Sequence, residues 1–280
     1  VMLYIELTDD IRFTKKELTG LTVVAKVWRG VSSLTELYSQ VSADGAADAS
    51  SLQQKTNKAM DALLTLPESI QPSKHLRDLH QQVTANRNSI NSKDKEKLAE
   101  LMKQLISYQK SVADNTNLSL DLSIDTSQLI TFLVAEGPLL IAQLSSVNQE
   151  AAGVVAKGSF TPKSYTDLNS SLGLIPERLM NAEKTIELSL SLNSQIEQQL
   201  SAPWKIAVKA ANEYSVFIKG QILDPDSITI SSQQVLTQGR ETIAHFNQLA
   251  QTSIPVLKAQ LEERIKQARF KNFIAFSMAF

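Results

Sequence analysis

Apolar residues recur along most of this chain in steps of three and four, and no other property of the sequence limits the possible folds as strongly. Side chains at such steps lie on one face of an α-helix. The clearest run extends from Leu18 to Val41 and includes Leu21, Val24, Trp28, Val31, Leu34 and Tyr38. The 280 residues contain only 9 Gly and 8 Pro, too few turn-forming residues for a fold with many strands. The sequence therefore predicts an all-α protein.

Breaks in this periodicity divide the chain into long helices. We predict helices over residues 6–41, 51–67, 73–90, 92–112, 126–158, 161–200 and 232–273. The pattern of the helix 161–200 resumes after Pro203 and continues to Ile218, and Pro138 is expected to bend the helix that contains it. The expected N-caps are Ser73, Ser92, Thr161, and either Asp125 or Thr126.

One polar segment separates the chain into two parts. Residues 115–125 interrupt the helical period with Asn, Thr, Ser and Asp side chains, which compete for backbone hydrogen bonds. We interpret this segment as a hinge between two helical modules, roughly 6–123 and 124–272. The first and last predicted helices then frame an elongated helical bundle.

Composition excludes several classes of partner and chemistry. Lys and Arg total 28 against 29 for Asp and Glu, so no overall positive charge attracts nucleic acid. The chain has no cysteine, which removes disulfides, thiolate metal ligands and cysteine nucleophiles. No catalytic motif of the common hydrolase, nucleotide-binding or metalloprotease types occurs, and we expect no enzymatic activity and no cofactor.

Both ends of the sequence are apolar. Residues 1–5 and 273–280 are each too short to cross a bilayer, which takes roughly 20 apolar residues. We interpret 1–5 as the end of one transmembrane helix and 273–280 as the start of a second, with a domain of residues 6–272 between them. Basic residues just before the second segment are expected at the membrane surface: Arg264, Lys266, Arg269 and Lys271.

Three stretches of the sequence resemble one known family. They are Ile11-Arg12-Phe13-Thr14-Lys15-Lys16-Glu17-Leu18-Thr19-Gly20 followed by Arg29-Gly30, Asn117-Leu118-Ser119-Leu120-Asp121-Leu122-Ser123-Ile124-Asp125-Thr126, and the run from Leu139 through Gly153 and Gly158 to Pro162. In order and spacing they are similar to the extracytoplasmic sensor regions of bacterial methyl-accepting chemotaxis proteins, which also occur on some sensor kinases and diguanylate cyclases. Leu122 replaces the usual proline of that family, and Asn148 stands where a second arginine often occurs.

The resemblance implies a function and a setting. It implies an all-α, ligand-sensing domain that faces the periplasm from the bacterial inner membrane, forms a homodimer and has two stacked four-helix-type modules, as in helical bimodular sensors. The implied partner is a small molecule, such as an organic anion, or a periplasmic binding protein. A sensor domain of a histidine kinase or diguanylate cyclase is the alternative within this class. A helical membrane-inserting toxin or structural protein is the alternative outside it, because residues 130–144 are strongly apolar.

Four residues are candidates for ligand contacts. Arg29, beside Trp28 on a predicted apolar helix, could present its guanidinium to a carboxylate; an internal salt bridge or a surface position over Trp28 is the alternative. Arg178 has the same two interpretations, because Glu177 and Glu183 lie close to it in the sequence. Asn148 could contact a ligand inside the bundle or form an interhelical hydrogen bond.

No metal site is predicted. Asn117, Asp121 and Asp125 carry oxygen ligands, but their spacing lacks the ligand density and central glycine of a calcium loop, so capping and turn formation explain them better. His75 and His80 are five residues apart and do not share a helix face as a zinc pair would, and His245 is isolated.

Overall fold

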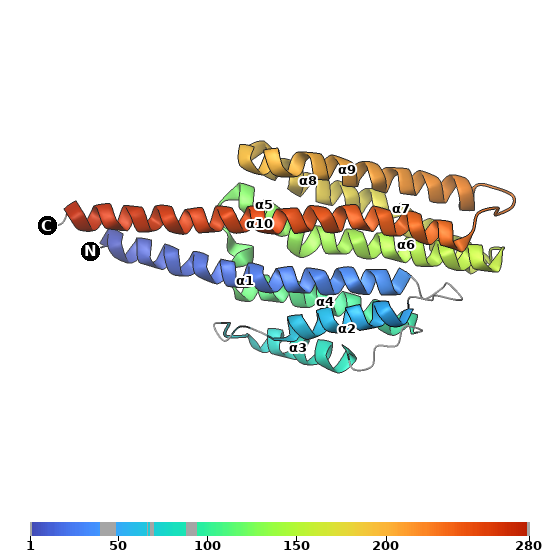
Figure 1. Ribbon diagram of the computed structural model, residues 1–280, viewed down its shortest axis with the longest axis horizontal. Coiled ribbons are helices and arrows are strands. Elements are labelled where there is room, and N and C mark those ends of the chain that lie inside the picture. Colours follow the sequence, from blue (N-terminus) through green and yellow to red (C-terminus); the bar gives the residue numbers. More distant parts are fainter. Residues whose placement is uncertain (1, 40–48, 66, 68–69, 88–93, 279–280) are drawn as a thin grey trace.

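The computed structural model describes residues 2–39, 49–65, 67, 70–87 and 94–278. Within these residues the secondary structure is helical, with no strand, which confirms the all-α prediction. The molecule is an elongated bundle whose helices run along its longest axis (Figure 1). The chain ends lie together at one end of it.

The first part of the chain forms one group of helices. Its elements are α1 (Met2–Ser39), α2 (Ala49–Leu64), α3 (Lys74–Arg87), α4 (Lys95–Asn115) and the 3₁₀ turn η1 (Leu118–Leu120). Helix α1 packs against α2 and α4, and α3 packs against α4. The turn η1 lies within residues 115–125, the segment interpreted above as a hinge.

The second part forms another group. Its elements are α5 (Ile124–Thr131), the π-helical turn η2 (Phe132–Glu136), α6 (Gly137–Lys157), α7 (Pro162–Gly173), α8 (Ile175–Leu192), α9 (Ser194–Ile218), the π-helical turn η3 (Lys219–Leu223) and α10 (Ser232–Met278). Helices α6 and α9 pack against α10, and α8 packs against both α5 and α9.

The two groups lie side by side along the length of the molecule (Figure 1). Helix α1 packs against α10 and α6 of the second group as well as against α2 and α4 of its own. The physical reason is visible in α1, where Val23, Val24, Val27 and Trp28 are all buried. A helix with apolar residues on more than one face needs neighbours on more than one side, and the second group supplies them along its length.

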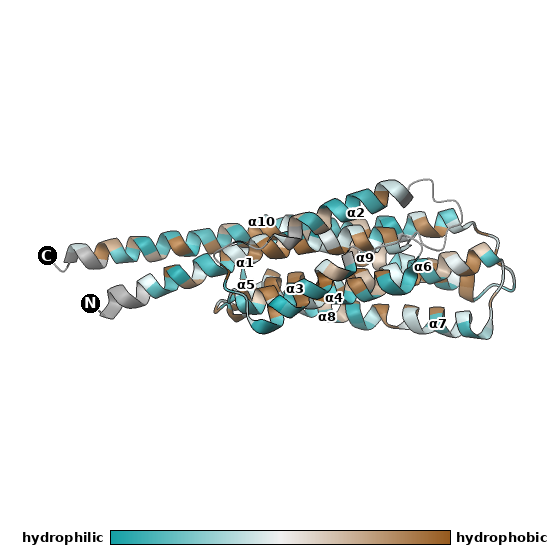
Figure 2. Cartoon of the chain, turned by 90° about the horizontal axis from the view of Figure 1, so that it is seen from below, coloured by the Kyte–Doolittle hydropathy of each residue, from teal (hydrophilic) through white to brown (hydrophobic). Residues whose placement is uncertain are grey.

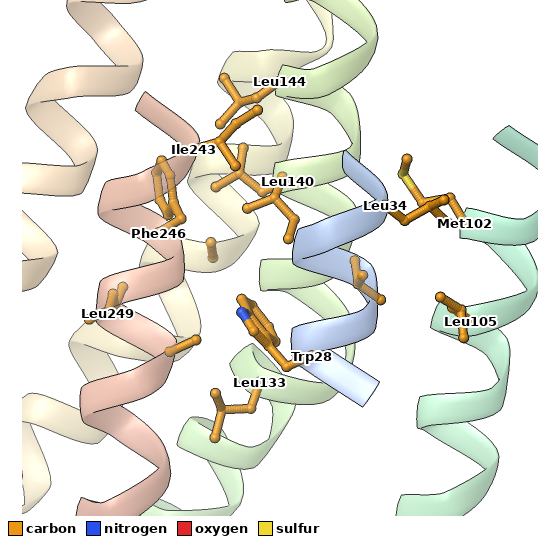
Figure 3. Packing of buried hydrophobic residues seen from close by; sticks show 14 of the residues in the cluster. Trp28, Leu34, Met102, Leu105, Leu133, Leu140, Leu144, Ile243, Phe246 and Leu249 are labelled. Carbon is orange, nitrogen blue, oxygen red and sulfur yellow. The ribbon is translucent and has the colours of Figure 1, made fainter. Parts of the chain in front are cut away.

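The shared core lies between α1, α6 and α10. Apolar residues face the interior and polar residues face outward (Figure 2). In the close view, Trp28 projects from α1 between Leu133 and Phe246, which belong to the second group (Figure 3). The rings of Trp28 and Phe132 are 6.2 Å apart, and Phe132 meets Trp204 edge-on at 6.4 Å. One continuous core therefore joins the two groups.

The most apolar part of the chain is a core helix. Among the described residues, Ile124–Lys157 is the one stretch long and apolar enough to cross a membrane, and 61% of its most apolar window is buried inside the protein. The turn η2 lies just before Pro138, and there the amide of Gly137 donates to the carbonyl of Phe132, one residue further back than in an α-helix.

Local capping signals were confirmed at several helix ends. The Ser73 hydroxyl accepts a hydrogen bond from the amide of Leu76, and Thr161 forms a reciprocal capping box with Ser164. Two other predicted N-caps were not confirmed: one was wrong, and the other lies outside the described residues. The N-cap of α5 is Ser123, and neither Asp125 nor Thr126. Ser92 lies outside the described residues, and Asp94 caps α4.

The predicted single helix 161–200 is interrupted twice. The first break is at Leu174, just before Pro176, and the second is at Asn193. Asn193 adopts an extended backbone, and its side-chain oxygen accepts hydrogen bonds from the amides of Gln195 and Ile196. As a result α8 and α9 pack against each other, whereas Pro203 lies inside α9 without ending it.

Candidate functional site

The four predicted ligand contacts do not converge on one site. Trp28 is 2% exposed, and its indole N–H donates to Oδ1 of Asn247 at 3.2 Å. Its neighbour Arg29 is exposed on the surface of α1. Trp28 is therefore a core residue with a satisfied donor, and Arg29 is a surface arginine.

Asn148 is fully buried on α6. Its Oδ1 accepts a hydrogen bond from the Tyr214 hydroxyl at 3.1 Å, which is the interhelical arrangement considered as the alternative. Gly239 of α10 lies so close that a Cβ atom there would overlap the Asn148 side chain. Nδ2 of Asn148 has no hydrogen-bond partner among the described residues. The space around this amide is thus filled by protein, not open to a ligand.

Arg178 lies in a different place, at a cavity of about 210 Å³ where α1, α4, α6 and α8 meet. Its lining consists of Tyr38, Ala99, Met102, Lys103, Ile106, Leu139, Ala142, Gln143, Ser146 and Arg178. Residues from both helix groups contribute to it. We call this feature the Arg178 pocket.

Helix spacing explains how these side chains share one cavity. On α6 the lining residues Leu139, Ala142, Gln143 and Ser146 follow the steps of three and four that place side chains on one helix face. The lining residues of α4 repeat the same spacing from position 99 to position 106. Arg178 is set opposite them in the first turns of α8, which begins at Ile175.

The charged residues that line the Arg178 pocket are both positive. Its two ionised lining residues are Lys103, which is exposed, and Arg178, which is half-buried. Among the described residues, no ion pair or side-chain hydrogen bond engages the Arg178 guanidinium. A free guanidinium beside apolar walls suits a carboxylate, which it can bind through two hydrogen bonds.

Neutral polar groups complete the pocket. Burial raises the pKa of the Tyr38 hydroxyl above its usual value, a hydrogen bond with Ser146 opposes this, and the charge of Glu150 adds to it. Tyr38 therefore remains a neutral hydrogen-bond donor at physiological pH. The amide of Gln143 is held by the carbonyl of Ser171 at 2.8 Å. The pocket thus combines two cations with an apolar surface and a few polar groups, as ligand sites commonly do.

The sequence indicated one of these residues and missed the others. Arg178 was a candidate, but Lys103, Gln143 and Ser146 carry no motif, and Tyr38 belonged to an apolar helix face. Only the packing of four helices brings them together. The spacing of Gln143 and Ser146 on a strongly apolar helix was the available signal.

A second polar cluster lies between α1, α10 and the segment after η1. Nη1 of Arg264 is 3.1 Å from Oδ1 of Asp121 and 3.6 Å from Oε2 of Glu17, and both carboxylate side chains are fully buried. Helix α10 therefore turns Arg264 partly inward, where its guanidinium pairs with these carboxylates and its side chain is 31% exposed. The position of this residue near a membrane surface stays a prediction. Lys266 itself is exposed and pairs with Glu263.

Two of the oxygen-rich hinge residues form hydrogen bonds within the protein. Oδ1 of Asp121 accepts the amide of Ser123 at 2.8 Å, a local turn, and Oδ2 of Asp125 accepts Nδ2 of Asn193 at 2.7 Å. Asn117 adopts a left-handed backbone conformation, with φ of 63°. In the described parts of the chain, no three His, Asp or Glu side chains are close enough to hold a metal ion.

No protein-family model, no curated protein and no solved structure matches this chain.

Proposed function

We propose that the chain is the extracytoplasmic ligand-sensing domain of a transmembrane receptor, of the chemoreceptor type, that faces the periplasm from the bacterial inner membrane. One observation carries the proposal. Helices α1 and α10 pack against each other, and both extend beyond the rest of the body at the same end (Figure 1). Such a pair can deliver a change in packing to a membrane on that side. The three stretches that resemble chemotaxis sensors support the same function.

The signal in this proposal is a small displacement of α10 relative to α1. Packed helices shift between discrete arrangements, typically by 1–2 Å at an interface. A ligand drives such a shift only if it binds one arrangement more tightly than the other. The Arg178 pocket suits this requirement, because its lining residues come from α1 and α4 of the first group and from α6 and α8 of the second. A ligand there contacts both helix groups.

The ligand class follows from the lining. Arg178 and Lys103 favour an anion, and Met102, Ile106 and Leu139 favour an apolar portion next to it. We propose a small organic anion with one apolar part. The receptor would act as a homodimer with a methyl-accepting output domain. In the alternative, the same sensor domain would control a histidine kinase or a diguanylate cyclase.

A thermal-shift screen tests this proposal. The isolated domain is heated with a panel of small organic acids, amino acids and inorganic anions. A ligand at 100 times its Kd adds about 2.7 kcal/mol, which raises the Tm of a domain of this size by about 5 °C. We expect a hit among the organic acids that is lost in Arg178→Ala and retained in Arg29→Ala.

Each other outcome points elsewhere. A hit lost only in Arg29→Ala would move the site to the surface of α1 and reject the Arg178 pocket. No hit with any anion would reject direct anion sensing and favour a periplasmic binding protein as the partner. Release of dye from liposomes by the domain would instead favour the membrane-inserting class, for which the apolar stretch Ile124–Lys157 is the source.

A further inference from the structure

The Glu17 carboxylate is buried without an adequate partner. Its side chain is fully buried on α1, and neither of its oxygens accepts a hydrogen bond of good geometry from any described residue. Nη1 of Arg264 is the nearest cation, at 3.6 Å. Burying an ionised carboxylate in this way is unfavourable unless a cation and hydrogen bonds compensate.

Arg264 is already committed to other groups. It donates to Oδ1 and Oδ2 of Asp121 at 3.1 and 3.4 Å and to the hydroxyl of Thr126 at 2.9 Å. One guanidinium therefore serves two buried carboxylates. If both acids were ionised, the cluster would carry a net negative charge in a place shielded from water.

The groups around Glu17 come from every element packed there. Asp121 follows η1, Arg264 belongs to α10, Thr126 belongs to α5, and Thr14 is on the preceding turn of α1. Burial, and then the charge of Asp121, raise the pKa of Glu17 to about 7; Arg264 and the Thr14 hydroxyl act in the opposite direction without cancelling them.

Solvent reaches the edge of this cluster through a cavity. A space of about 310 Å³ lies next to it, lined among others by Thr14, Leu122, Arg264 and Ala268. Its other ionised lining residues are Asp9, Asp10 and Lys271. The cavity is lined by residues 9–14 of α1 and 264–271 of α10. Both helices extend from there beyond the rest of the body (Figure 1).

We propose that Glu17 is a proton-binding site that sets the packing of α1 against α10. With the proton bound, Glu17 and the Asp121–Arg264 pair form a neutral cluster, and the two helices stay closed over it. Loss of the proton to solvent leaves an extra negative charge between them. Hydrating that charge requires water to enter from the cavity, which moves α1 away from α10. This device does not depend on the proposed ligand or on the Arg178 pocket; in a receptor it would add external pH as a stimulus.

Distance measurement between the two helices tests the proposal. The chain has no cysteine, so spin labels at Lys15→Cys and Arg269→Cys, both exposed positions on α1 and α10, report this separation alone. The distance distribution is recorded by pulsed electron paramagnetic resonance from about pH 5.5 to about pH 8.5, a range that brackets the titration. We expect the separation to increase or broaden as the pH rises, with a midpoint near neutral pH.

Three variants of the labelled chain separate Glu17 from other titrating groups. In Glu17→Gln the distance should not change with pH, because the amide is always neutral. In Glu36→Gln, the matched control on the same helix outside the cluster, the change should remain. In Asp121→Asn the midpoint should move to lower pH, since Arg264 then serves Glu17 alone.

Clear results would overturn the proposal. A constant distance in the parent protein across the pH range rejects it, whether or not Glu17→Gln folds. A change that persists in Glu17→Gln assigns the titration to another group. An unshifted midpoint in Asp121→Asn rejects the sharing of one arginine by two acids.

Discussion

The Glu17 carboxyl links the stability of the protein to pH through one residue. Its pKa is about 7 in the folded protein and 4.5 in the unfolded chain, so the folded state binds more protons between these values. Because the folded state binds the extra proton, the free energy of unfolding falls as the pH rises through this range. The contribution of Glu17 is complete below about pH 4.5 and is lost by about pH 7.

The first prediction concerns the size of this effect. We expect the free energy of unfolding to fall by at most about 3 kcal/mol between about pH 5 and about pH 8, since one pKa unit corresponds to about 1.4 kcal/mol. Urea unfolding at a series of pH values measures it. In Glu17→Gln the decline should flatten, and the variant should be more stable than the parent protein at the higher pH. An unchanged pH profile in Glu17→Gln would contradict the assignment.

The second prediction concerns Arg264. Arg264→Ala leaves two buried acids without their cation, and we expect a loss of about 3–5 kcal/mol at about pH 8. The loss should be smaller near pH 5, where Glu17 can be protonated. The matched control is Lys266→Ala, which removes an exposed pair with Glu263 and should change stability by less than about 1 kcal/mol. Equal losses in both variants would show that Arg264 is not a buried counter-ion.

Among the helices, close approach depends on a few small residues. Gly20 of α1 lies against Thr116, which follows α4, so near that a Cβ atom would overlap the threonine side chain. Thr116 is itself 3% exposed and donates a hydrogen bond to the carbonyl of Val112 at 2.8 Å. Gly137 of α6 makes a similar contact, since a Cβ atom there would be 2.6 Å from Cη2 of Trp28. These glycines set how closely α1 approaches α4 and α6.

The third prediction tests this close packing. We expect Gly20→Ala to lower stability by about 1–3 kcal/mol, because a buried side chain that is too large forces the helices apart. Gly173→Ala is the control, since nothing lies within 4 Å of its Cβ position at the end of α7. The control should leave stability unchanged or raise it by up to about 1 kcal/mol through helix propensity. Chemical denaturation of the two variants measures these changes in stability. Equal changes in Gly20→Ala and Gly173→Ala would show that Gly20 is not a packing constraint.

In the whole molecule, α1 binds the two helix groups into one unit. It packs against α2 and α4 on one side and against α6 and α10 on the other, and the buried side chains form one continuous core. Both helix groups therefore share α1 as a packing partner. This arrangement also determines how the protein unfolds.

The fourth prediction is a single unfolding transition for both groups. Trp28 reports on α1 and Trp204 on α9, and both are buried in the core. In Trp204→Phe and in Trp28→Phe, the fluorescence of the remaining tryptophan should follow the same denaturation midpoint as the helical circular dichroism of that variant. Separate midpoints, with the fluorescence of one tryptophan lost first, would show that the groups unfold independently.

Local signals explain why much of the helical structure could be predicted. Spacing of three and four residues predicts helices whatever the tertiary fold, and Ser73, Thr161 and Gly158 end or begin helices through contacts within a few residues. Asn193 shows the limit of such signals. The apolar period is the same whether the chain continues straight or reverses, so the turn between α8 and α9 was missed.

Side-by-side packing, the Arg178 pocket and the Glu17 cluster depended on tertiary structure. Arg264 and Asp121 are 143 residues apart in sequence, and the pocket draws residues from four helices. Periodicity shows that a face is apolar, but it does not identify the helix that covers it. Burial then changes the pKa of a side chain. A glutamate carboxyl is an ionised, solvated group on an exposed turn, whereas Glu17, buried between α1 and α10, has a pKa raised to about 7.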